Sequence, residues 1–210
     1  MNATQPLARC LHGFFHEYLA AQRGLSLNTI FSYRDALKLL LRFGSDRMGK
    51  PVDKLALDDV DEKMVLAFLD DLETPCGNST ETRNNRLAAL RTFMRYVAYR
   101  DPMRLPQCQQ ICALPTKRTQ HKTVEYLEDH EIGALLKRVD LGSDHGSRDY
   151  ALLLFLYNTG ARVQEAVDLK MDDLRLASPF QVKLTGKGRK ERVCPLWPET
   201  VAAIQDSELR

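Results

Sequence analysis

The chain has 210 residues, of which 44% are hydrophobic, 28% charged and 8% aromatic, and its formal net charge is +2. This composition excludes a disordered tail, a collagen-like repeat and a coiled-coil rod as the main organisation, and it predicts one large or two small globular domains. The longest apolar run, Ala151 to Tyr157, is far shorter than the roughly 18 residues of a membrane-spanning helix. The first sixteen residues contain no secretory signal, so we expect a cytoplasmic protein without membrane contacts.

Charges of opposite sign are separated along the chain. Residues 53–73 carry eight acidic side chains against two lysines, whereas residues 78–122 carry nine Lys or Arg against two acids. A second basic stretch, residues 183–192, holds five cations and one acid. A charge run is usually only solvated surface, but two basic clusters that are distant in sequence favour a polyanion, and nucleic acid is the leading candidate.

Three helices are predicted before residue 75. Apolar residues recur at helical spacing over residues 7–23, 27–43 and 60–72, and residues 44–51 are expected to form a loop because they include two glycines and a proline. Arg34 and Lys38 lie along one stripe of the second helix.

The fourth predicted helix, which Ser79 or Thr80 can cap, has two distinct faces. The residues expected in the core are Leu87, Leu90, Met94 and Val97. A neighbouring face presents Asn84, Arg91 and Arg95, which are the donors that a helix in a DNA major groove requires. The alternative is an exposed, arginine-rich helix with no special role.

Residues 100–123 contain three prolines and no periodicity, so they predict an extended basic linker with Lys117, Arg118 and Lys122 near its end. A second domain follows, with helices predicted over about 126–139, 148–158 and 161–170. Alternating apolar residues over 174–196 around a Gly-Lys-Gly-Arg-Lys turn predict a β-hairpin. The expected fold class is therefore mainly α with a small antiparallel β-hairpin. The five scattered cysteines fit reduced thiols, and we expect no metal site.

Two basic residues of the second domain suggest phosphate binding. Arg162 falls in the first turn of a predicted helix, where the helix dipole disfavours a cation unless an anion is shared there. The alternative is a pair between Arg162 and Glu165 across one helical turn. Lys187 lies between two glycines at the hairpin tip, where its ammonium could reach into a groove, although exposed Gly-Lys turns are common.

Taken together, these residues resemble the tyrosine site-specific recombinases, or phage-type integrases. Residues 27–37 and 82–93 look like that family's core-binding domain, Thr159-Gly-Ala-Arg-Val-Gln-Glu looks like its first arginine box, and residues 186–190 look like the hairpin with its catalytic lysine. The resemblance implies a four-helix, SAM-like core-binding domain over residues 1–103, a linker over 104–123, and the N-terminal part of a catalytic domain over 124–210.

The resemblance also implies a reaction on double-stranded DNA. A tyrosine attacks a phosphodiester to form a 3′-phosphotyrosyl link without a metal or other cofactor, within a synaptic tetramer of recombinase protomers. Arg162 would stabilise the transition-state charge, and Lys187 would protonate the departing 5′ oxygen. The DNA-binding residues would be Thr29, Arg34, Lys38, Asn84, Arg91, Arg95, Lys117, Arg118, Lys122, Arg189 and Lys190.

One part of the family pattern is absent. The family's His-x-x-Arg box and nucleophilic tyrosine lie C-terminal to the hairpin, but the last tyrosine of this sequence is Tyr157. We therefore expect the 210-residue chain to be inactive by itself, since the nucleophile is required for the covalent route. Two alternatives are a non-catalytic regulator that competes for recombination sites and a helical protein-interaction module.

Overall fold

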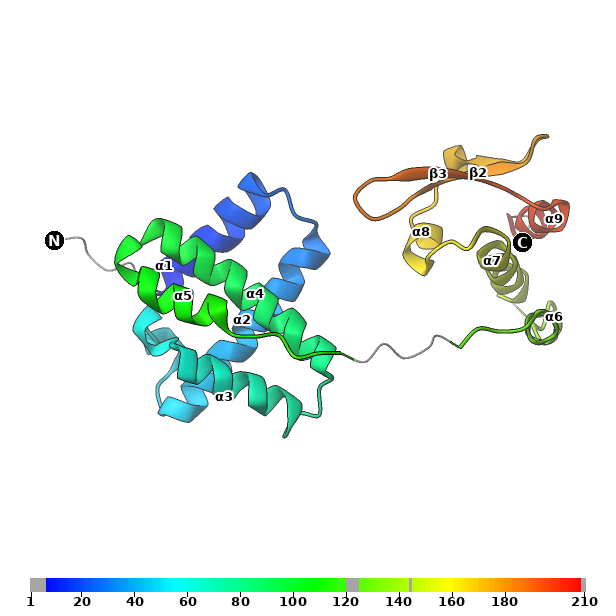
Figure 1. Cartoon of the computed structure of the whole chain (residues 1–210). Helices are drawn as coiled ribbons and strands as arrows, with labels where there is room; N and C mark the ends of the chain where they lie inside the picture. Colours follow the sequence, from blue (N-terminus) through cyan, green and yellow to red (C-terminus); the bar gives the residue numbers. More distant parts are fainter. Residues whose placement is uncertain (1–6, 120–124, 144, 209–210) are drawn as a thin grey trace. The chain divides into compact units, whose positions relative to one another are not determined.

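The computed structural model describes residues 7–119, 125–143 and 145–208. The chain divides into two compact units, residues 1–122 and residues 123–210 (Figure 1). Among the residues that the structure describes, no helix is long and apolar enough to cross a membrane.

In the part of the first unit that the structure describes, every regular element is a helix. Its longer elements are α1 (Leu7–His12), the π-helical segment η1 (Gly13–Gln22), α2 (Leu27–Met48), α3 (Glu62–Glu73), α4 (Thr80–Arg100) and α5 (Leu105–Ala113). Short 3₁₀ turns occupy Val52–Lys54, Leu57–Asp59 and Pro102–Arg104. Side-chain oxygens of Ser26, Asp61 and Ser79 cap α2, α3 and α4 by accepting bonds from backbone N–H groups of the first turn.

Helix α4 runs through the core of this unit as the sequence predicted. The four residues expected to face the core are all buried; they are Leu87, Leu90, Met94 and Val97. Phe93 on the same helix is also buried and meets Phe14 edge to face, with ring centroids 5.2 Å apart. Arg86 donates to the Ser32 carbonyl at 3.1 Å and joins α4 to α2.

Helix α2 continues through the residues that were expected to form a loop. Gly44 is buried within it, and a Cβ at this position would lie 1.8 Å from Cε of Met64 on α3. The glycine therefore serves the close packing of α3 against α2 instead of breaking the helix. Gly49, with φ of 62°, ends α2 in the left-handed conformation.

A second difference lies in residues 105–113, which form helix α5 and not extended linker. Cys108 and Ile111 are buried against the first unit's core, and Leu114 after the helix is buried too. Pro106 is tolerated because it sits in the first turn, where an N–H has no helical partner. Burial raises the pKa of the Cys108 thiol to about 11, so at neutral pH this side chain packs as an uncharged group.

The second unit combines short helices with a three-stranded antiparallel sheet in the order β1-β2-β3. Its helices are α6 (Asp129–Lys137), α7 (Gly146–Thr159), α8 (Val163–Val167) and α9 (Pro198–Glu208), with a 3₁₀ turn at Met171–Asp173. Its strands are β1 (Leu174–Arg175), β2 (Gln181–Thr185) and β3 (Glu191–Pro195). The predicted hairpin and the mainly α fold class are confirmed.

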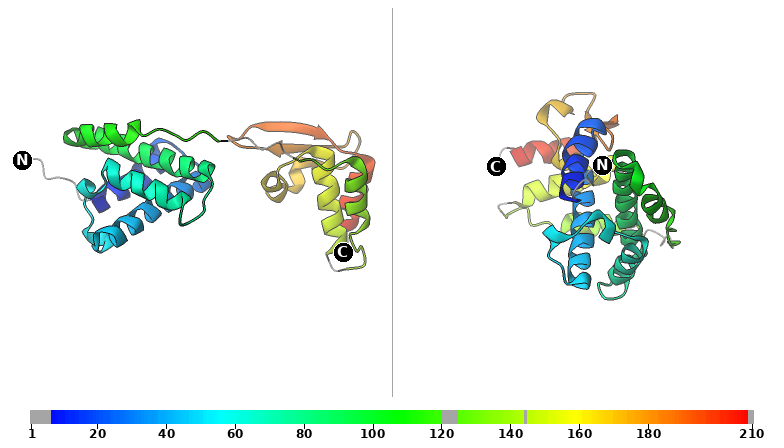
Figure 2. Two further views of the ribbon diagram at one scale, coloured as in Figure 1. Left: turned by 60° about the horizontal axis from the view of Figure 1, so that its bottom comes forward. Right: turned by 90° about the vertical axis from the view of Figure 1, so that its left-hand side faces the viewer.

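The sheet covers one side of the second unit's helices (Figure 2). Val182 and Leu184 alternate along β2, are fully buried, and form a core with Phe155 of α7 and Val201 of α9. Strand β3 pairs with β2 so that Thr185 lies opposite Glu191. This register places residues 186–190 in the loop at the end of the hairpin.

Candidate nucleic-acid interface

Helix α2 carries three of the predicted DNA-binding residues near its N-terminal half. The hydroxyl groups of Thr29 and Ser26 are hydrogen-bonded at the start of the helix, with Oγ1 and Oγ 2.9 Å apart. Arg34 pairs with Asp35 at 3.2 Å, and its guanidinium also lies 4.9 Å from the centre of the Phe31 ring. Lys38, one turn further, is exposed. Arg34 is 58% exposed despite its neighbours, so both cations face solvent on this helix.

The predicted face of α4 has a different immediate partner, which is the chain that follows α5. Asn84 donates from Nδ2 to the Lys117 carbonyl at 2.8 Å and accepts from the Lys117 N–H at 3.1 Å. Arg91 donates to the Leu114 carbonyl, and Arg83 donates to the Pro115 carbonyl at 3.4 Å. These bonds hold residues 114–117 along α4, and we call this arrangement the linker clamp. Whether Asn84 and Arg91 also contact DNA stays a prediction.

Arg95 lies outside the linker clamp and is exposed. It lines a hollow of about 410 Å³ on the first unit, formed by Tyr18, Gln22, Arg95, Tyr96, Tyr99 and Arg100. In the segment after α5, Lys117 pairs its ammonium with Glu73, and Arg118 is exposed. Lys122 lies outside the described residues.

Arg162 occupies the N-cap position of α8, immediately before the helix, and its side chain is 72% exposed. Its Nη1 donates to Oε1 of Glu165 at 2.8 Å, and its backbone N–H donates to Oε2 of the same carboxylate at 3.0 Å. The pairing with Glu165 that the sequence allowed is therefore present. Because a guanidinium has five N–H donors, the pair leaves most of them free toward solvent.

Glu165 is the common hydrogen-bond partner of Arg162 and Arg192 in the second unit. Its side chain is only 4% exposed, and Oε2 also accepts a bond from Nη2 of Arg192 on β3 at 2.8 Å. The hydrogen bond from Arg192 has the largest effect and the bond from the Arg162 N–H the next largest, and they lower the pKa of the carboxyl from 4.5 to about 2. The carboxylate is thus ionised at neutral pH and joins α8 to the sheet.

The hairpin loop closes over the same carboxylate. A Cβ at Gly186 would lie 2.7 Å from Oε1 of Glu165, so the loop backbone passes directly beside it. Lys187 follows Gly186 and is exposed. Through Glu165, the structure therefore brings Arg162 to the base of the loop that carries Lys187, although the two residues are 25 positions apart.

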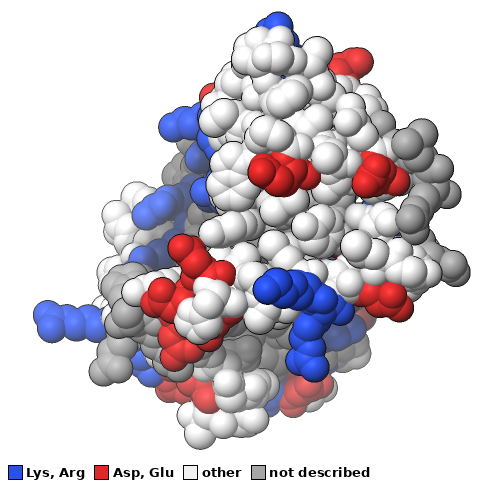
Figure 3. Space-filling view, turned by 90° about the vertical axis from the view of Figure 1, so that its right-hand side faces the viewer, with Lys and Arg blue, Asp and Glu red and all other residues white. Residues whose placement is uncertain are grey.

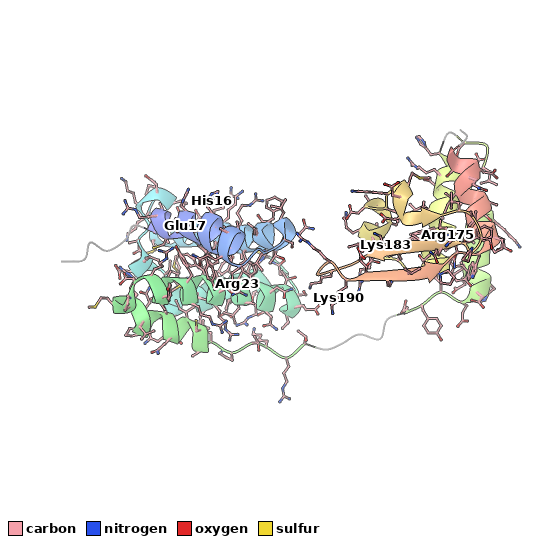
Figure 4. All side chains as sticks on the ribbon, turned by 90° about the horizontal axis from the view of Figure 1, so that it is seen from above. His16, Glu17, Arg23, Arg175, Lys183 and Lys190 are labelled. Atoms are coloured by element: carbon pink, nitrogen blue, oxygen red, sulfur yellow. The ribbon has the colours of Figure 1, made fainter. Side chains whose placement is uncertain are left out.

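The loop itself is tightly turned. The Gly186 N–H donates to the Lys190 carbonyl at 2.8 Å, and both Gly188 and Arg189 have positive φ, at 78° and 59°. Arg189 and Lys190 are exposed. Figure 4 shows Lys190 at the end of the hairpin and Lys183 further along the sheet. Cationic side chains therefore gather at the loop end.

A different part of the surface has another character. In Figure 3, the centre of the view is mostly uncharged, and acidic groups and a basic patch lie around it.

The one His-x-x-Arg sequence in the chain, His145 to Arg148, begins at the start of α7, about 20 Å along the helix from the end that leads to Arg162. It therefore does not join the Arg162 site.

Sequence reasoning missed two residues of this site, Glu165 as its centre and Arg192 as a partner. The spacing of Glu165 three residues after the N-cap position was a usable signal, because a Glu there accepts the N-cap N–H. Arg192 was counted only within a basic stretch. Nothing in the local pattern distinguishes it from the exposed cations beside it.

Comparisons with known proteins agree with this architecture. The profile described as "Phage integrase, N-terminal SAM-like domain" matches residues 14–101, and that of the "Phage integrase family" matches residues 125–208. Two Sinorhizobium fredii proteins named "Putative integrase/recombinase" are similar to the chain. The protein y4rD is 41% identical over 94% of this chain and 71% of its own length. The protein y4rC is 40% identical over 98% of this chain and 62% of its own length. Tyrosine recombinase XerC of Pelobacter propionicus is 30% identical over 96% of this chain and 64% of its own length.

Solved structures with the same fold include the XerH site-specific recombinase bound to a palindromic difH substrate. That structure has a TM-score of 0.65 at 20% identity and is matched by 100% of this chain, which spans 62% of it. The Tn1549 transposon integrase in complex with a circular intermediate DNA has a TM-score of 0.60 at 16% identity, and the match covers 94% of this chain and 63% of that chain. The chain thus spans less than two thirds of the length of several proteins that it matches.

Proposed function

The chain belongs to the phage integrase family, and on that premise we propose that it binds double-stranded DNA and presents Arg162 and Lys187 to a single phosphodiester. The observation that carries this proposal is the Glu165 carboxylate, which binds Arg162 and lies against Gly186, the residue before Lys187. One buried anion therefore connects two exposed cations that come from distant parts of the sequence.

The two cations have separate chemical roles in the proposed reaction. The guanidinium of Arg162 binds the nonbridging phosphate oxygens and stabilises the charge that grows on them in the transition state. In this reaction a tyrosine from outside residues 1–210 gives up its phenolic proton to a base, and its oxygen forms a bond to phosphorus while the bond from phosphorus to the 5′ oxygen breaks. Lys187 gives its proton to that 5′ oxygen. The product is a 3′-phosphotyrosyl link, which synaptic tetramers of recombinase protomers exchange between strands.

DNA contacts in this proposal come from both units. In the first unit the exposed cations Arg34, Lys38, Arg95 and Arg118 would meet phosphates, Arg34 with the donors that Asp35 does not take. Asn84 and Arg91 would contribute the donors that the linker clamp does not use, and Lys117 would contribute the ammonium donors that Glu73 does not take. Arg189 and Lys190 flank Lys187 on the hairpin loop. Phosphate contacts of this kind set affinity and orientation, and they make binding sensitive to salt.

The test is duplex binding measured by fluorescence anisotropy over a range of salt concentrations. Removing one cation that neutralises a phosphate lowers the slope of log affinity against log salt by about 0.9. Because both residues are proposed to meet the same phosphate, the double variant Arg162→Gln, Lys187→Gln should reduce the magnitude of the slope by about 0.9. The matched control is Lys54→Gln, Lys63→Gln, which removes two charges from the acidic stretch and should leave the slope unchanged.

Two results would overturn the proposal. Salt-independent binding of the unaltered chain would favour a protein-interaction module over a DNA-binding protein. Equal slopes for the Arg162, Lys187 variant and for the unaltered chain would remove these two residues from the DNA interface.

A further inference from the structure

Arg192 differs from the other cations of the hairpin because it points to a protein carboxylate. Its Nη2 lies 2.8 Å from Oε2 of Glu165, and its side chain is 38% exposed. Exposed ion pairs contribute little, but the Glu165 partner is almost completely buried at 4% exposure. Losing Arg192 would leave a buried carboxylate without one of its three bonds, which is costly for a desolvated charge.

The three bonds to Glu165 come from two separate elements. Arg162 supplies one side-chain and one backbone donor from the start of α8, and Arg192 supplies the third from β3, 27 positions after Glu165. Gly186 on the other side of the hairpin has room for no side chain next to Oε1. Both sides of the Lys187 loop therefore meet the same carboxylate, Gly186 before the lysine and Arg192 after it.

We propose that Arg192 is a positioning residue that, through Glu165, holds the Lys187 hairpin against α8 and thereby sets the place of Lys187 relative to Arg162. The proposal rests on the function proposed above. It assigns Arg192 to the support of the phosphate site and not to a phosphate contact of its own. Breaking the Arg192 bond would loosen the hairpin from the carboxylate, whereas the two bonds from Arg162 to Glu165 would remain.

The first measurement requires no DNA. An NMR titration follows the Glu165 side-chain carboxyl and the Gly186 amide in the full chain and in Arg192→Gln, Arg192→Lys and Arg175→Gln. We expect the Glu165 pKa to rise and the Gly186 amide signal to move in Arg192→Gln, with a smaller change in Arg192→Lys. Arg175→Gln is the matched control. It also removes a cation from the sheet, but the guanidinium of Arg175 donates to the Ser178 carbonyl and not to Glu165.

The second measurement is a double-mutant cycle on duplex affinity with Arg192→Gln and Arg162→Gln. If Arg192 acts through Glu165, its substitution weakens binding when Arg162 is present and has little further effect when Arg162 is absent. Arg192→Lys should recover part of the affinity. A direct phosphate contact would instead make the two effects additive and lower the salt slope by about 0.9 in both backgrounds.

The outcomes separate this inference from the function on which it rests. Additive effects in the cycle, or an unchanged Glu165 titration in Arg192→Gln, would overturn the role of Arg192 while leaving DNA binding in place. Salt-independent binding by the unaltered chain would overturn the proposed function, and the Glu165 and Gly186 signals would then decide by themselves whether Arg192 holds the hairpin.

Discussion

The linker clamp makes a quantitative prediction about Asn84. Replacing Asn84 by Ala removes both side-chain bonds to the Lys117 backbone, at 2.8 and 3.1 Å. A net contribution of about 0.5–1.5 kcal/mol for each bond gives about 1–3 kcal/mol in total for holding this segment closed. Local opening at Lys117 should therefore become about 5 to 150 times more frequent.

Amide hydrogen exchange of Lys117 measures this opening directly, because its N–H donates to Oδ1 of Asn84. Asn84→Asp is the matched control: a carboxylate still accepts the Lys117 N–H, but it cannot donate to the Lys117 carbonyl. We expect the exchange rate to rise strongly in Asn84→Ala and less in Asn84→Asp.

Unchanged Lys117 exchange in Asn84→Ala would refute the reasoning, since it would mean that the segment is held by other contacts. Adding duplex DNA extends the test. If Asn84 leaves the linker clamp to contact DNA, then the Lys117 amide of the unaltered chain should exchange faster when DNA is bound. If Asn84 keeps its place, DNA should leave that exchange unchanged or slow it.

Three further predictions concern the second unit. Because the folded-state pKa of Glu165 is lowered to about 2 from 4.5, its contribution to stability is complete above about pH 4.5 and is lost as the pH falls toward 2. Urea unfolding followed by the fluorescence of Trp197, the one tryptophan of the sequence, should show this loss in the unaltered chain and a weaker pH dependence in Glu165→Gln. Gly186→Ala should destabilise the unit by about 1–3 kcal/mol through overpacking against a carboxylate that is bonded in place. Gly133→Ala, where a Cβ meets open space, should cost nothing in the same assay, and equal effects of the two would contradict the packing argument. Finally, a nicked suicide duplex should form no covalent adduct with the polypeptide of residues 1–210, and a protein-DNA band that survives denaturing electrophoresis would disprove this.

Most local features of this protein follow from short-range patterns in its sequence. The core face of α4 repeats every three to four residues, and Ser79 begins the helix because a serine hydroxyl can accept a first-turn N–H. The hairpin follows from alternating apolar residues around a glycine-rich turn. These features involve neighbours within a few residues, so a single stretch of sequence contains all of the physical information.

The errors arose where a residue's role depends on a distant partner. Gly44 resembles a helix breaker until α3 packs against it, and residues 105–113 resemble a linker until α4 offers an apolar surface to Cys108 and Ile111. Prolines and glycines carry strong local signals, and tertiary packing outweighed those signals at both places.

The candidate site divides in the same way. The sequence by itself determined which residues have suitable chemistry, since Arg162 and Lys187 stand out by charge and by position on a helix start and a turn. Only the tertiary structure decided that Asn84 holds the linker and that Arg192 turns inward to Glu165. A cation's partner depends on which carboxylate or carbonyl the folded chain brings within about 3 Å, and one-dimensional periodicity does not contain that information.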